Sequence, residues 1–215
     1  MSKSIYRKTG KKIWVVLSPI IYTLSPILAS RLLFWISTGK KLDLEKPESF
    51  NEKLMWLKLF WQHPLVSICA DKYEVRNYVE SKGFTHILPK LYGKYENTNE
   101  IEWSILPDKF ALKCSHGCGF NVICINKSKI DIPKESKKLQ KWLQKRYAFE
   151  AAEIQYDSIT PRIICEEYIE TTAGFLPNDY KIYCFNGEPK LTLVCTERAN
   201  EVRLKFMDLN WNEMI

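Results

Sequence analysis

The sequence is poor in several features that mark particular protein classes. Only eight of its 215 residues are glycine and three are histidine, and no segment matches a nucleic-acid-binding module. Its seven cysteines are an odd number without the spacing of a disulfide scaffold, which favours free thiols in a reducing compartment. With 46% hydrophobic and 27% charged residues, neither wholesale disorder nor a polytopic membrane protein fits. We therefore expect a folded protein of the cytoplasm.

The charge is positive, at +7, with lysines gathered in the first 12 residues and between Lys127 and Arg146. Phosphate, an anionic lipid or a nucleic acid would each complement this charge. The second run of lysines alternates with Leu139, Trp142 and Leu143 at helical spacing. This pattern indicates the solvated face of an amphipathic helix, and we expect no nucleic-acid contact there.

Residues 13–36 form an apolar run that follows Lys11 and Lys12. Pro19, Pro26 and Arg31 make this run a poor membrane-spanning helix, although its first part approaches the ~20 residues that a span requires. Three interpretations remain open, namely a segment lying at a membrane interface, helices packed on the body of the protein, and a span or signal peptide. The basic residues at its start slightly favour the lipid surface.

Two helix starts are legible after this run. Ser49 precedes Glu52 by three residues, which is the pattern of a capping box, and a helix should begin there. Asp71 is the candidate N-cap of a second helix, which would place Lys72 in its first turn and end at Gly83. A cation in a first helical turn opposes the helix dipole, so Lys72 is either solvated or held by an anion.

The remaining elements predict an α+β fold with antiparallel sheet. A short strand is expected over 87–95, a small helical turn within 96–107, a β-hairpin over 107–125, and a strand over 162–170. The alternation over 179–194 around Asn186-Gly187 predicts a second hairpin with a type I′ turn. Because no βαβ repetition is present, a parallel sheet is not expected.

The first hairpin carries the strongest chemical signal. Lys113 ends an apolar strand, and the turn that follows contains Gly117 and Gly119. Glycines let a backbone approach an anion closely, and successive N–H groups in such a turn can bind phosphate. A zinc site at Cys114, His116 and Cys118 lacks a second ligand pair with zinc-site spacing, and a purely structural turn remains an alternative.

Six motifs in this order resemble the ATP-grasp superfamily, and more narrowly its TupA-like family, named for teichuronopeptide biosynthesis. The resemblance runs from about Lys41 to the end of the chain. Its motifs are KPESFNEKLMWLK (46–58), DKYEVR (71–76), LKCSHG (112–117), PRIICE (161–166), DYK (179–181) and FNG (185–187).

The resemblance implies ATP held between two α+β lobes, with lysines on the phosphates. Carried over, the phosphate-binding and catalytic cations are Lys72, Lys113 and, on the acceptor side, Lys181. The covering turn supplies Ser115, His116, Gly117, Gly119 and Asn121, the nucleoside side supplies Glu166, Glu167 and Ile169, and Asp179 matches a position near the phosphates on the acceptor side, as Lys181 does. The implied lobes are 106–160 and 161–215, preceded by a basic and apolar segment over 1–40 and a helical region over 41–105.

The implied reaction joins a carboxylate to an amine through an acyl phosphate, using ATP and Mg²⁺, in the assembly of a cell-surface polysaccharide such as a capsule or teichuronopeptide. The carboxylate would belong to an amino acid or a sugar acid, and the acceptor to a lipid-linked glycan at the inner membrane face. No counterpart of the family's metal ligands is present, so we expect them beyond Ile215 and the second lobe to be incomplete. The alternatives are a non-catalytic binding module and a glycosyltransferase of the same pathway, although no Asp-x-Asp motif supports the latter.

Overall fold

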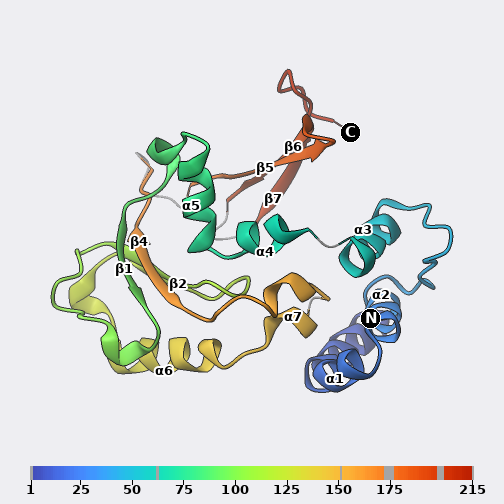
Figure 1. Cartoon of the computed structure of the whole chain (residues 1–215), viewed down its shortest axis with the longest axis horizontal. Helices are drawn as coiled ribbons and strands as arrows, with labels where there is room; N and C mark the ends of the chain where they lie inside the picture. Colours follow the sequence, from blue (N-terminus) through green and yellow to red (C-terminus); the bar gives the residue numbers. More distant parts are fainter. Residues whose placement is uncertain (1, 62, 151, 172–176, 198–200, 215) are drawn as a thin grey trace. The chain divides into compact units, whose positions relative to one another are not determined.

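The computed structural model describes residues 2–61, 63–150, 152–171, 177–197 and 201–214, and shows two compact units (Figure 1). The first unit is Met1–Glu167 and the second is Tyr168–Ile215. The boundary falls within the range 161–215 that the sequence assigned to the second lobe.

The chain begins with a pair of packed helices, α1 (Ser2–Leu24) and α2 (Pro26–Thr38). Pro19 lies inside α1 without ending it. Pro26 is the first residue of α2. Proline is tolerated at this position because the N–H that it lacks would have no hydrogen-bond partner within the helix. Ser25 caps this start by accepting a hydrogen bond from the Leu28 amide, and Gly39 ends α2 with a φ of 75°. Pro26 therefore marks the boundary between two helices, and residues 13–36 do not form one continuous helix.

These two helices are packed on the rest of the unit. Trp14 and Tyr22 are buried with Phe34, Met55 and Phe149 in one apolar cluster. The indole N–H of Trp14 donates to the Glu150 carbonyl at 2.9 Å. This face of α1 therefore packs on the body of the protein, which is one of the three interpretations left open for residues 13–36. Among the residues described, no helix combines the length and the apolar character that crossing a membrane requires.

Three helices lead to the sheet, namely α3 (Phe50–Phe60), α4 (Pro64–Ala70) and α5 (Glu74–Ser81). The capping box of Ser49 and Glu52 is present at α3, as the sequence predicted. The prediction for α5 was wrong at its start. Asp71 lies upstream of the helix, where its carboxylate accepts from the amides of Tyr73 and Glu74. Lys72 therefore precedes α5, and the helix dipole does not act on it as a first-turn residue.

The first unit contains a four-stranded antiparallel sheet in the order β1-β4-β2-β3. Its strands are β1 (Leu91–Tyr95), β2 (Phe110–Cys114), β3 (Asn121–Cys124) and β4 (Ile163–Glu167). The strand expected over 87–95 begins only at Leu91, because Ile87 ends a 3₁₀ turn. The short helical turns are η1 (Thr85–Ile87), η2 (Thr98–Glu100), η3 (Lys127–Lys129) and η4 (Ile154–Tyr156).

The sheet has one apolar face and one charged face. Phe110, Leu112 and Cys165 point to the apolar face, where Leu139 of α6 (Ile132–Leu143) is buried against them. The basic segment thus forms the amphipathic helix that the sequence predicted. A short helix, α7 (Tyr147–Glu150), follows it. Helix α5 lies on the other side of the sheet from α6 (Figure 1), so the charged face is covered only in part.

The second unit is a three-stranded antiparallel sheet in the order β5-β6-β7. Its strands are β5 (Asp179–Phe185), β6 (Glu188–Thr196) and β7 (Arg203–Met207). Asn186 and Gly187 have φ values of 54° and 83°, as a type I′ turn requires, so the predicted hairpin is confirmed. All named strand pairs of the described residues are antiparallel, and the α+β class is confirmed.

We predict that Trp14→Ala lowers the free energy of unfolding by about 3–5 kcal/mol, because a buried aromatic ring and a hydrogen bond are removed together. Val16 is 72% exposed on the same helix, and Val16→Ala should change stability by less than about 0.5 kcal/mol. Urea denaturation followed by circular dichroism measures both variants. Equal stability of the two would contradict the packing of α1 on this unit.

Candidate anion-binding site

The charged face of the sheet carries a row of polar side chains on adjacent strands. Asn121 on β3 lies opposite Lys113 on β2, which lies opposite Ile164 on β4. Ile164 is in turn opposite Lys94 on β1. Directly opposite residues of an antiparallel pair point to the same face, so both lysines project from this face. Two of the predicted site residues, Lys113 and Asn121, are thereby neighbours.

Glu166 lies at the centre of this face and is only 6% exposed. One oxygen of its carboxylate accepts from the Lys113 ammonium at 2.7 Å, and the other accepts from the Arg76 guanidinium at 2.9 Å. Arg76 also donates to the Pro89 carbonyl at 2.7 Å. A buried carboxylate needs such partners, since an unpaired one would lose its hydration without compensation. Through these two contacts, Glu166 of β4 holds Lys113 of β2 and Arg76 of α5 in place.

Lys72 approaches the same region from the segment before α5. Its ammonium donates to the carbonyl of Gly117 at the tip of the glycine turn. Within the described residues this ammonium has a neutral carbonyl, and no carboxylate, as its hydrogen-bond partner. Burial lowers the pKa of Lys72, and the positive charge of Lys113 lowers it further. A half-buried cation without a carboxylate partner favours binding of an anion, which would raise the pKa again.

The glycine turn is shaped by the ring of Phe120. This ring is buried and stacks on Trp142 at 5.5 Å between centroids. A Cβ at Gly117 would lie 2.5 Å from the Phe120 ring, so only glycine allows the backbone to pass this close. Gly119 needs its glycine for a different reason, because its φ is 77°. The two predicted glycines are therefore both required by the observed turn.

Ser115 ties the start of this turn to the segment before β4. Its hydroxyl donates to the Thr160 carbonyl at 3.0 Å and accepts from the Arg162 amide at 3.2 Å. The Arg162 guanidinium contacts Glu74 at 3.0 Å and Asp71 at 3.5 Å. Ser115 thus has its hydroxyl engaged by backbone and acts in positioning the turn.

His116 points away from the charged face. Its Nε2 donates to the Trp142 carbonyl at 3.0 Å, and burial lowers its pKa. Cys114 is buried in the core, where burial raises its pKa to about 12, while Cys118 is exposed on the turn. The zinc alternative for these three residues therefore finds no support in the geometry.

The remaining predicted residues are not gathered in this group. Glu167 projects to the opposite face at the end of β4 and accepts from the Lys90 amide at 3.4 Å. Ile169, Asp179 and Lys181 belong to the second unit. There, Lys181 on β5 donates to the carboxylate of Asp179. The structure thus brings together Lys72, Lys113, Ser115, Gly117, Asn121 and Glu166.

Sequence reasoning missed three cations of this site. Arg76 and Arg162 were inside quoted motifs but received no role, and Lys94 was not considered. Lys94 and Arg162 both lie over the ring of Tyr73, at 5.1 and 5.5 Å. The signals in the sequence were the alternation of side chains along β1 and the presence of the two arginines within the motifs.

We call the five basic side chains of this site the cation cradle, namely Lys72, Arg76, Lys94, Lys113 and Arg162. Three acidic residues, Asp71, Glu74 and Glu166, accompany these five cations.

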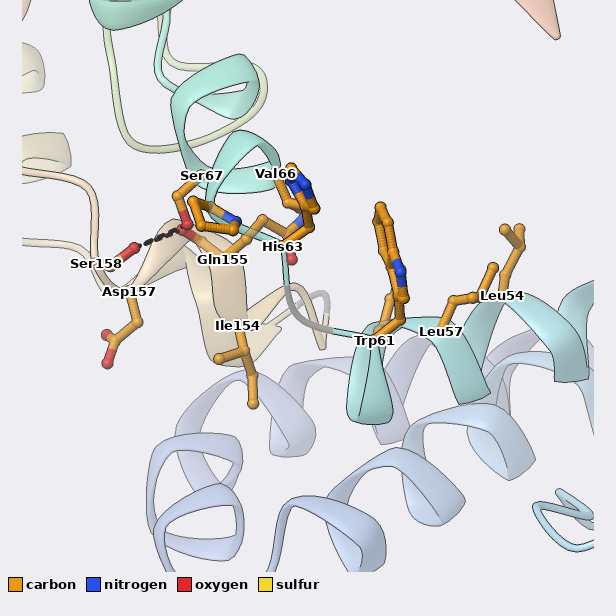
Figure 2. A pocket seen from close by; sticks show the side chains of 12 residues that line it. Leu54, Leu57, Trp61, His63, Val66, Ser67, Ile154, Gln155, Asp157 and Ser158 are labelled. Carbon is orange, nitrogen blue, oxygen red and sulfur yellow. Dashed lines mark hydrogen bonds between the residues drawn. The ribbon is translucent and has the colours of Figure 1, made fainter. Parts of the chain in front are cut away.

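A cavity of about 790 Å³ lies elsewhere in the first unit, between α3, α4 and η4. Figure 2 shows Leu54, Leu57 and Trp61 along one wall and His63 with Val66 on the other. At its edge Ser158 donates to the hydroxyl of Ser67 at 3.0 Å. His63 Nδ1 accepts from the Leu65 amide, so it caps α4, as expected for a histidine at a helix end. No residue of the cation cradle lines this cavity.

The residues described do not supply a metal site. Among them, no group of three or more histidine, cysteine, aspartate or glutamate side chains is arranged to hold an ion. Glu166, the buried carboxylate of the site, already has two cations as partners. These residues therefore fit an anionic ligand and do not fit Mg²⁺ by themselves.

We predict that Glu166→Gln lowers the free energy of unfolding by about 3 kcal/mol, because two cations lose their shared counter-ion. The matched control is Glu48→Gln, whose ion pair with Lys46 is fully solvated and should contribute less than about 0.5 kcal/mol. Thermal and urea denaturation measure both. A Glu166→Gln variant as stable as the control would show that Glu166 does not hold the cradle together.

Comparison with known proteins identifies the family of this chain. The sequence model described as TupA-like ATPgrasp matches residues 52–215, which include every residue of the cation cradle. No curated protein and no solved structure matches the chain. Because the match covers more than half of the sequence, the chain belongs to the TupA-like ATP-grasp family.

Proposed function

We propose that the cation cradle binds the phosphates of ATP and that the chain is a carboxylate–amine ligase. The observation that carries the proposal is Lys72, a half-buried cation whose ammonium meets a glycine-turn carbonyl rather than a carboxylate. Lys113 lies on the same face, already oriented by Glu166. Membership of an ATP-grasp family supports ATP as the anion.

In the proposed reaction, a carboxylate oxygen attacks the γ-phosphorus of ATP. The bond to the β,γ-bridging oxygen breaks, which gives an acyl phosphate and ADP. An amine then attacks the acyl carbon, phosphate leaves, and the amine loses a proton as the amide forms. Lys72 and Lys113 would stabilise the negative charge of the transferring phosphoryl group. ATP-grasp chemistry uses Mg²⁺ to neutralise phosphate charge, and the roles proposed for these lysines do not depend on it.

The glycine turn would cover the phosphates and exclude water, which otherwise hydrolyses an acyl phosphate. The close approach of Gly117 to the Phe120 ring supports this role, because the absence of a side chain at Gly117 leaves the backbone accessible there. Glu166 and the chain after it would receive the nucleoside. Lys181 and Asp179 would serve the acceptor side from the second unit. His116, bonded to the Trp142 carbonyl, would support the turn from behind rather than transfer a proton.

The substrate class we propose is an amino acid or sugar acid that supplies the carboxylate, with an amine on a cell-surface polysaccharide precursor. The setting would be the inner face of the cell membrane. Family membership supports the ligase class, and the basic N-terminal segment supports the setting.

We predict that Lys113→Ala weakens MgATP binding by about 100-fold, because losing one partner of a charged contact costs about 2–5 kcal/mol. Isothermal titration calorimetry measures the affinity, and Lys129→Ala, an exposed lysine of η3, is the control. Unchanged affinity in a folded Lys113→Ala variant would overturn the phosphate assignment. Saturable binding without amide formation on any tested acceptor would instead support a binding module.

We further predict that MgATP slows alkylation of Cys118, since this exposed thiol sits in the turn between Gly117 and Gly119. Cys69, exposed on α4, serves as the internal reference and should react at the same rate with and without nucleotide. Cys114 and Cys165 should stay unmodified at neutral pH, because burial raises the pKa of each to about 12. Mass spectrometry after timed maleimide labelling gives the rates. Equal slowing at Cys69 and Cys118 would contradict coverage of the turn by ATP.

A further inference from the structure

The helix pair α1–α2 carries a second apolar surface besides the one packed on the body. Apart from Val15, five large apolar side chains of α1 are exposed, among them Val16 at 72%, Ile20 at 62% and Leu24 at 79%. At 3.6 residues per turn, these five fall within about 100° of one another and form one stripe. The stripe consists of Ile13, Val16, Leu17, Ile20 and Leu24.

The buried stripe of α1 lies on a different side of the same helix. Trp14, Ser18 and Tyr22 recur every four residues and are each 4% exposed or less. Their centre is rotated by about 150° from the centre of the exposed stripe. An ordinary surface helix places polar residues on its outer face, whereas the outer face of α1 carries this apolar stripe. Because the stripe is exposed, the packing of α1 on the described part of this unit does not account for it.

Helix α2 extends the exposed surface with an aromatic residue and a cation. Leu28, Arg31 and Trp35 are exposed at spacings of three and four, and Trp35 is 61% exposed. Lys40 and Lys41 follow the end of α2 and are also exposed. Tryptophan beside arginine and lysine is the composition found at the boundary between lipid headgroups and acyl chains.

The charge of this segment is complementary to an anionic surface. Residues 1–42 contain eight lysines and arginines and no aspartate or glutamate. The rest of the chain holds the other 24 basic residues against all 25 acidic ones and is nearly neutral. The whole net charge of +7 is therefore carried by the two helices and their flanks. The family match begins only at residue 52, so the ATP-grasp family does not account for this segment.

We propose that the exposed stripe of α1, with Leu28 and Trp35 of α2, lies in the interface of an anionic lipid bilayer. The helices would lie parallel to the membrane, with the apolar stripe among the acyl chains and the basic residues at the headgroups. Lysines and arginines near an anionic membrane each strengthen binding, and apolar burial makes it persistent. This inference concerns the segment before the ATP-grasp match and does not require the ligase proposal to hold.

The test is co-sedimentation of the full chain with vesicles of phosphatidylcholine alone or mixed with phosphatidylglycerol. We expect binding to the anionic vesicles, weaker binding to the neutral ones, and partial release as salt is raised. The double variant Val16→Asp with Ile20→Asp should lose binding by about tenfold or more, because two charges enter the apolar stripe. The matched control is Ile105→Asp, at a site that is 71% exposed outside the helix pair, which should bind as the wild type does.

Insertion is separated from simple charge attraction by fluorescence quenching. Brominated acyl chains should quench tryptophan emission of the wild type, and Trp35→Phe should lose most of that quenching. A folded wild type that ignores anionic vesicles, or a double variant that binds them equally, would overturn the proposal. Self-association of the wild type without lipid, abolished in the double variant, would assign the stripe to a second copy and overturn it as well. Calorimetry with MgATP on the double variant keeps a lipid result separate from the ligase proposal.

Discussion

The carboxylate of Glu166 is the interaction on which the candidate site depends. It comes from β4, and its two partners come from β2 and α5, so a single side chain joins three elements that lie far apart in sequence. A carboxylate with 6% exposure is stable in this position only if both oxygens are engaged. Lys113 therefore has a defined position before any ligand arrives, and Arg76 holds α5 over the charged face.

The strands that carry the cations of the site also form the apolar core, so the position of the cations depends on the packing of the core. In β2, Leu112 and Cys114 are buried against α6 while Lys113 between them points to the opposite face. A shift of one residue in register would move Lys113 into the core and expose its neighbours, so the apolar packing determines which face carries charge. The glycine turn follows the same logic, since Phe120 is buried next to Trp142 and the turn backbone must pass its ring.

Local signals in the sequence predicted the elements that depend on neighbours along the chain. The capping box at Ser49, the hairpin turn at Asn186-Gly187 and the amphipathic helix around Leu139 each need only a few residues to specify them. The start of α5 failed because Asp71 caps amides two and three residues later from outside the helix, a geometry that resembles an ordinary N-cap in sequence. Helix α5 begins two residues later than an N-cap at Asp71 predicts, and this removes the helix dipole as the reason for considering Lys72.

Contacts between distant segments were beyond the reach of such reasoning. The pairing of Arg76 with Glu166 spans 90 residues, and the order β1-β4-β2-β3 depends on β4 inserting between strands that precede it. The glycine hairpin alone pointed to Lys113, whereas Glu166 received a role only through the family resemblance. Arg162 and Lys94, which share the ring of Tyr73, became part of the site only when the sheet was assembled.

Helix α1 shows why composition alone left the N-terminal segment open. A helix with one apolar stripe either packs on a protein or lies on a membrane, but α1 has two stripes about 150° apart. Trp14 and Tyr22 use the first to attach the helix to the body. The second stripe remains exposed to water, which costs about 25 cal/mol for each Å² of apolar surface. It lies in the part of the chain that carries all of the net charge. Attachment on one side and lipid on the other is the arrangement that uses both stripes.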